Sequence, residues 1–249
     1  MRKSYFLIMA DMTFVTLFVT TSMVSAAELD IAEISGFLHI DGALSMTADN
    51  SSSSFTSALD VSNLGSYGWT FTNSSSAVWK GVSFLAFLDA DVDRTVNTFL
   101  NEIGECVDLS LPSGAPSGAI AATSWEIDEP GYLFGDIYAN LYDGMLDNTN
   151  AVGRGMPDDV SMALGFYLGD LAPGETADIT LFTSLSNIGG LRHEDPASGY
   201  AFYYNGYATV TGRDIDPPQP VPVPEPSTIV LMTLGLLVGQ VLARRMRRG

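Results

Sequence analysis

Four acidic residues whose type and spacing could bind a metal ion lie in the middle of the chain: Asp89, Asp91, Asp93 and Glu102. The three aspartates alternate, as the first ligands of a calcium loop do, and calcium binds several converging carboxylate oxygens at about 2.4 Å. The loop is not an EF-hand, because Arg94 stands where the turn glycine should be and Leu100 where the last glutamate should be. We expect either a calcium site at these four residues or a strand end whose carboxylates cap a turn and face water.

A second acidic group, Glu126, Asp128 and Glu129, could form a carboxylate pair with Asp136 or with Asp158–Asp159. Paired carboxylates hydrolyse glycosides when their surroundings separate their pKa values. Such pairs also arise by chance in an acid-rich chain. The sequence has no nucleophile elbow, zinc-protease motif, phosphate-binding glycine loop or Cys-His pair. It therefore predicts a protein that is not an enzyme, with a secreted glycoside hydrolase as one alternative.

The charge of the chain excludes one class of partner. The formal net charge is −18, and the stretch 28–226 holds 28 acidic and five basic residues, a balance of −23. Such a surface repels phosphate backbones, so nucleic acid is not an expected partner. Cys106 is the single cysteine, which rules out an intramolecular disulfide, and we expect it to be a small buried hydrophobe. We expect His39 to be structural, and we place His193 in a polar loop.

Short apolar runs separated by Gly, Pro, Asn, Asp and Ser at intervals of about ten residues predict the elements that position these groups. This rhythm predicts one all-β domain over 27–213, an antiparallel β-sandwich of Ig-like or jelly-roll-like type. The expected strands are 34–40, 58–61, 67–72, 82–87, 105–111, 122–127, 135–141, 161–168, 177–184 and 201–210. We expect 161–168 and 177–184 to pair through a turn at Pro173-Gly174.

Aromatic residues gather in the last of these strands. Alternation predicts that Phe202 and Tyr204 lie in the core and Tyr203 outside, although rings on an exposed face could instead stack on sugars. We expect Trp69, Trp79 and Trp125 to lie in the core as well.

The N-terminal residues 1–26 read as a secretory signal peptide. They combine a basic tip, an apolar stretch and small residues before the expected cleavage site between Ala26 and Ala27. Signal peptidase is therefore an expected partner.

The C-terminal residues divide into three segments. We expect residues 214–227 to form a proline-rich linker that is stiff and extended. We expect the apolar residues 228–243 to form a transmembrane helix about 24 Å long, which is short for a bilayer core of about 30 Å. Residues 244–249 are a basic tail that we expect to stay cytoplasmic through the stop-transfer residues Arg244, Arg245, Arg247 and Arg248, with the domain on the outer side.

Pro224-Glu225-Pro226, the short apolar span and the arginine-rich end together resemble the PEP-CTERM sorting signal of exported proteins in Gram-negative, exopolysaccharide-producing bacteria. The resemblance implies recognition by an exosortase, a transpeptidase-like membrane protein, with cleavage near these three residues. A plain single-pass anchor with a proline-rich stalk is the alternative. The body, for example 69–73 and 87–93, resembles more loosely the domains of several PEP-CTERM proteins, which have no firm activity.

The sequence thus predicts an inner-membrane-tethered precursor that becomes a structural or adhesive protein of the cell surface or exopolysaccharide matrix, with extracellular polysaccharide as a further partner. No cofactor is expected apart from calcium. A calcium-dependent carbohydrate-binding module is the main alternative function.

Overall fold

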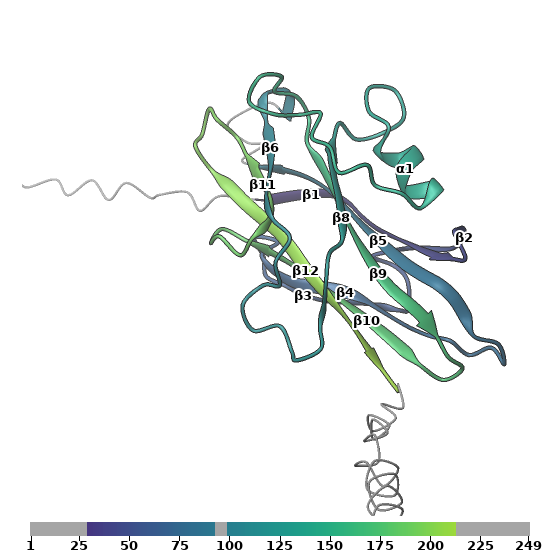
Figure 1. Cartoon of the computed structure of the whole chain (residues 1–249). Helices are drawn as coiled ribbons and strands as arrows, with labels where there is room; N and C mark the ends of the chain where they lie inside the picture. The colour runs from purple at the N-terminus through teal and green to yellow at the C-terminus, as the bar shows by residue number, and fades with distance from the viewer. Residues whose placement is uncertain (1–28, 93–98, 213–249) are drawn as a thin grey trace, which may run out of the picture.

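Antiparallel strands supply nearly all the regular structure of the computed structural model, which describes residues 29–92 and 99–212 (Figure 1). The strands are β1 (Leu29–Ile40), β2 (Ala43–Asp49), β3 (Phe55–Leu59), β4 (Gly65–Thr72), β5 (Trp79–Val92), β6 (Ile103–Asp108), β7 (Ile120–Ala121), β8 (Ser124–Asp128), β9 (Ser161–Leu171), β10 (Thr176–Ser184), β11 (Gly190–Glu194) and β12 (Ala201–Thr211). A 3₁₀ turn, η1 (Phe99–Asn101), and one helix, α1 (Ile137–Asp143), complete the described elements.

The strands form two sheets that pack face to face. The five-stranded sheet has the order β2-β1-β5-β9-β8, and the seven-stranded sheet has the order β3-β4-β10-β12-β11-β6, with β7 paired to β12. Apolar side chains from both inner faces make the main core, among them Trp69, Phe84, Leu164 and Tyr204. The predicted antiparallel β-sandwich is confirmed.

The outer face of the five-stranded sheet carries a second, smaller core under α1. Phe37, Leu85 and Phe87 point outward from β1 and β5 and pack against Ile137 and Leu141 of the helix. The central strand β5 is therefore apolar on both faces at this point, which explains its nearly continuous run of hydrophobic residues.

The strand that we predicted over 135–141 is wrong, because this segment contains the beginning of α1. Ile137 and Leu141 are four residues apart, so they share one face of a helix, and both are fully buried. Gly144 ends the helix in the left-handed conformation, with φ at 79°. A helix of seven residues shows only two apolar positions of its period, which is too little to distinguish it from a strand in the sequence.

The strands β2 and β11 were not predicted. The segment of His193, which we expected to be a polar loop, is strand β11, and it pairs with both β12 and β6. β2 was missed because most of its residues are exposed and polar at the sheet edge. The turn at Pro173-Gly174 is present, but β9 and β10 do not pair, because the turn crosses from one sheet to the other.

The predictions for the aromatic residues are confirmed where the side chains are fully buried. Phe202 and Tyr204 lie in the core and Tyr203 is partly exposed on the other face. Trp69 is fully buried, whereas Trp79, Trp125 and Cys106 are partly buried at the edge of the core. His39 is buried, and its Nε2 lies 2.9 Å from the Leu141 carbonyl oxygen, so its role in fixing α1 is structural.

The long strand β12 runs between two opposite ends of the sandwich. Near its start, Phe202 is opposite His193 of β11, and at its end Thr211 is opposite Thr176 of β10. No helix within 29–92 and 99–212 has the length and apolar character needed to cross a bilayer. The predicted signal peptide, the linker, the transmembrane helix and the basic tail lie outside the described residues.

Candidate metal centre

A row of carboxylates lies on the outer face of the five-stranded sheet, beyond the small core under α1. Asp89 and Asp91 extend from the last part of β5, and Asp159 lies two residues before the start of β9. The register places Asp89 opposite Ser161 of β9 and opposite Glu33 of β1. Antiparallel pairing therefore brings the end of one strand and the start of another to the same place.

Glu102 joins this row from the segment that leads into β6. Its backbone N–H donates to the Asp158 carbonyl oxygen at 3.1 Å, and the Asp158 N–H donates back to the Glu102 carbonyl oxygen at 3.1 Å. This isolated bridge holds the segment of Glu102 against the segment of Asp159. The position of Glu102 is thus set by backbone pairing.

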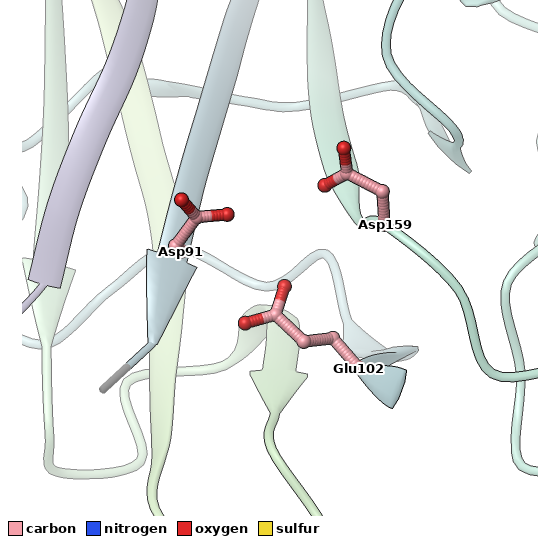
Figure 2. A group of neighbouring side chains, drawn as sticks. All are labelled: Asp91, Glu102 and Asp159. Atoms are coloured by element: carbon pink, nitrogen blue, oxygen red, sulfur yellow. The ribbon is translucent and has the colours of Figure 1, made fainter. Parts of the chain in front are cut away.

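Three of these side chains converge. One carboxylate oxygen each from Asp91, Glu102 and Asp159 lie within 4.8 Å of one another. Figure 2 shows the three carboxylates turned toward a common space from three separate parts of the chain. The donors are all oxygens, which is the ligand set that hard cations such as calcium prefer.

Two hydrogen bonds fix the side chain of Glu102. Its side chain is 2% exposed, Oε1 accepts a hydrogen bond from the Val92 N–H at 3.0 Å, and Oε2 accepts one from His193 Nε2 at 2.7 Å. His193 is itself fully buried, with its ring against Phe202 at a centroid distance of 5.1 Å. The histidine therefore acts as a buried support for Glu102.

Negative charge accumulates at this centre. Burial, together with Asp91 and Glu102, raises the pKa of Asp159 to about 6, although the nearby His193 acts in the opposite direction. Burial, followed by Asp159 and Asp91, raises the pKa of Asp89 to about 7. Asp159 Oδ1 is buried and has no hydrogen-bond partner within the described part of the chain. A divalent cation among these oxygens would relieve the repulsion.

The structure brings together two of the four predicted metal ligands, Asp91 and Glu102. Asp89 lies next to them on β5 but outside the group of three, and Asp93 lies outside the described residues. The third member, Asp159, was predicted only as part of a possible carboxylate pair. The signal that could have found it is the pairing of β5 with β9, which the sequence alone does not reveal.

The second acidic group forms as well, from Glu126, Asp128 and Asp136. Asn140 Nδ2 donates to Glu126 Oε1 at 2.9 Å, while Asp128 accepts backbone N–H groups of Glu129 and Asp136 at 2.9 and 2.7 Å. Glu126 and Asp128 thus pair with Asp136, whereas Glu129 lies beside Asp158, and burial followed by Asp158 raises the pKa of Glu129. Asp159 belongs to the first group. Glu126 Oε2 is buried without a hydrogen-bond partner in the described chain, and burial raises the Glu126 pKa to about 7.

Comparisons with known proteins bear on the C-terminal tail. A family model described as the PEP-CTERM protein-sorting motif matches residues 222–248, which include Pro224, Glu225 and Pro226. No curated protein and no solved structure is found similar to the chain. The motif implies export and processing at the membrane of a Gram-negative bacterium by exosortase-like machinery. The chain therefore carries a PEP-CTERM protein-sorting motif in its tail, which supports an exported protein that exosortase-like machinery sorts by way of that tail.

Proposed function

We propose that the exported domain is a non-enzymatic structural or adhesive component of the cell surface or exopolysaccharide matrix, and that a calcium ion held by Asp91, Glu102 and Asp159 stabilises one end of its sandwich. The convergence of these three buried or half-buried carboxylates is the observation that carries the proposal. The sorting motif supplies the location.

The positions of the three ligands explain what the ion would do. Asp91 ends β5, Glu102 precedes β6 and Asp159 precedes β9, so one ion would tie together three connections from both sheets. Calcium outside cells is millimolar, and extracellular modules use sites with dissociation constants of about 0.1–1 mM. Three carboxylates leave further coordination positions for water, which suits such a site.

A structural role is also supported by the state of the other acidic group. Glu126 and Asp128 are 1% and 4% exposed, so they offer little access to a sugar that would be hydrolysed between them. Both residues also hold the chain around α1 through hydrogen bonds. No feature of the described residues favours the hydrolase over the structural role.

Thermal unfolding tests the calcium site. We expect the full chain, purified in detergent and freed of metal with EDTA, to gain about 2.7 kcal/mol of stability when calcium reaches a hundred times its dissociation constant. Asp159→Asn should abolish this gain, because it removes one of the ligands. The matched control Asp136→Asn, in the second acidic group, should keep it. A melting temperature that does not change up to about 10 mM calcium would contradict the site.

A calcium-dependent carbohydrate-binding module remains a second proposal, because a pocket of about 450 Å³ adjoins the centre. Its lining combines the acidic residues Glu129, Asp158 and Asp159 with the apolar residues Phe99, Leu100, Pro130 and Phe134. A sugar could there meet both the ion and apolar side chains. Sugar binding that disappears in EDTA and returns with calcium would support this function over a purely structural one.

A further inference from the structure

A separate pocket of about 360 Å³ lies on the outer face of the five-stranded sheet, between β1, β2 and α1. Its lining combines three tyrosines with hydroxyl and carboxylate groups. The residues that matter here are Glu33, Ser35, Asp49, Tyr132, Tyr138 and Tyr142. A volume of this size is at the small end of the range for ligand pockets, about 300–1,000 Å³.

The rings of Tyr132, Tyr138 and Tyr142 form a tyrosine platform that packs on the five-stranded sheet through Phe87. Tyr138 of α1 packs on Phe87 of β5, with ring centroids 5.0 Å apart. Tyr132 stacks on Tyr138 at 5.2 Å with an angle of 27° between the planes, and it lies 6.5 Å from Tyr142 at 32°. Tyr132 and Tyr142 are nevertheless 68% and 46% exposed. Rings so exposed add little to the core, yet their orientations are held by their neighbours.

Polar groups are held beside this platform. The Tyr138 hydroxyl donates to Glu33 Oε2, and the Ser35 hydroxyl donates to Glu33 Oε1 at 2.5 Å. Burial and the bond to Glu33 keep the pKa of Tyr138 well above its usual value, so the hydroxyl remains a donor. A carboxylate accepts up to about four hydrogen bonds, so Glu33 keeps acceptor capacity for a ligand. Asp49, which accepts from Ser51 and Ser52, adds a second fixed carboxylate.

This combination selects one class of ligand. The residues that line the pocket include no lysine or arginine, and two of them are acidic, so phosphates and other anions are disfavoured. A cage for a quaternary ammonium group surrounds the cation with the faces of several accessible rings. Here the exposed rings of Tyr132 and Tyr142 lie at only 32° to one another, and Phe37, which stands at 71° to Tyr142, is 4% exposed. Nearly parallel exposed rings next to hydrogen-bond acceptors match a sugar ring, which has an apolar C–H face and hydroxyl groups around its edge.

We propose that this pocket binds neutral hexose units of a polysaccharide, with Tyr132 and Tyr142 stacking on the sugar and Glu33 accepting hydrogen bonds from its hydroxyls. The site uses no metal ion and does not depend on the calcium centre. It gives the exported domain a means of attaching to a glycan surface.

The test is electrophoresis of the full chain through detergent-containing native gels with hydroxyethylcellulose, laminarin or galactomannan. We expect at least one of these neutral glycans to retard the protein, equally in EDTA and in calcium. Tyr132→Ala and Tyr142→Ala should each weaken binding about tenfold. Glu33→Gln should weaken it less, because the amide still accepts one hydrogen bond.

Tyr167→Ala is the matched control, since Tyr167 is also exposed on the five-stranded sheet, at 58%, but does not line the pocket. It should bind as the unaltered protein does. Retardation by none of the three glycans, or retardation that survives both tyrosine variants, would overturn the proposal. Binding that requires calcium would assign the sugar to the pocket beside Asp159 instead. Saturable quenching of tyrosine fluorescence by tetramethylammonium, lost in Tyr132→Ala, would assign this pocket to a cationic ligand.

Discussion

The two acidic groups of the five-stranded sheet differ in how the protein compensates their charge. In the group around Glu126, the amide of Asn140 and backbone N–H groups donate to the carboxylates. In the group around Glu102, the Val92 N–H and the His193 ring donate to Glu102. Asp159 and Glu126 each keep one buried oxygen without a hydrogen-bond partner among the described residues, but the other oxygen of Glu126 accepts from Asn140.

This difference separates two uses of buried carboxylates. A carboxylate whose oxygens accept hydrogen bonds from its own chain stabilises local structure, as Asp128 does for the loop before α1. Carboxylates that face one another repel and destabilise the fold until a cation or protons neutralise them. The contrast can be measured, because the two kinds of carboxylate should respond differently to mutation and to calcium.

The largest effect should come from Glu102→Ala. This change leaves the Val92 N–H and His193 without their buried acceptor, so we expect a loss of about 3 kcal/mol in the free energy of unfolding, measured by urea titration in EDTA. The stabilisation by calcium should also disappear. A variant as stable as the unaltered protein would show that Glu102 does not hold this end of the sandwich together.

A smaller effect should appear as a dependence of stability on pH in EDTA. The pKa values of Asp89 and Glu126 are raised to about 7 and that of Asp159 to about 6, so the folded protein binds more protons than the unfolded chain from about pH 4 to 7. The free energy of unfolding should therefore fall as the pH rises through this range, by about 2 kcal/mol after a discount for solvent screening. Urea titrations at pH 5 and pH 7.5 measure this decrease in the free energy of unfolding.

Saturating calcium should reduce this fall, because the bound ion favours the ionised form of Asp159. Glu126→Gln should remove only the part of the pH-dependent decrease in stability that Glu126 causes. Stabilisation of the fold by calcium should remain in this variant. Stability that rises between pH 5 and pH 7.5 in EDTA would show that the raised pKa values do not govern the fold.

The smallest effect should be the most diagnostic, because its sign differs between the groups. In EDTA at pH 7.5, Asp159→Asn removes a repelled charge and should stabilise the fold by about 1 kcal/mol. Asp128→Asn should destabilise it by about 1 kcal/mol, since one of the two oxygens that accept backbone N–H groups becomes a donor. Changes of the same sign in both variants would remove the distinction between the groups.

The sequence was informative where a pattern is local. The alternation in β12 correctly placed Phe202 and Tyr204 inside, and the rhythm of short apolar runs indicated a sandwich. The tail motif was identified from a contiguous stretch. Each of these signals is contained within a few neighbouring residues, so none required knowledge of how distant strands pair.

Signals that depend on distant pairing were missed or only partly found. The group of Asp91, Glu102 and Asp159 exists because β5 pairs with β9 and because Glu102 bridges to Asp158. The tyrosine platform depends on α1, which was predicted as a strand, since a seven-residue helix has too few turns to show its period. Burial of His193 follows from strand neighbours on both sides of β11.

The direction of β12 places the acidic centre and the C-terminal end of the described domain at opposite ends of the sandwich. The start of β12 lies next to His193 and the acidic centre, and its end at Thr211 leads toward the sorting tail, about 35 Å away along the strand. An ion or a ligand bound at the acidic centre would therefore lie most of the length of the sandwich away from the point where the chain continues toward the sorting motif.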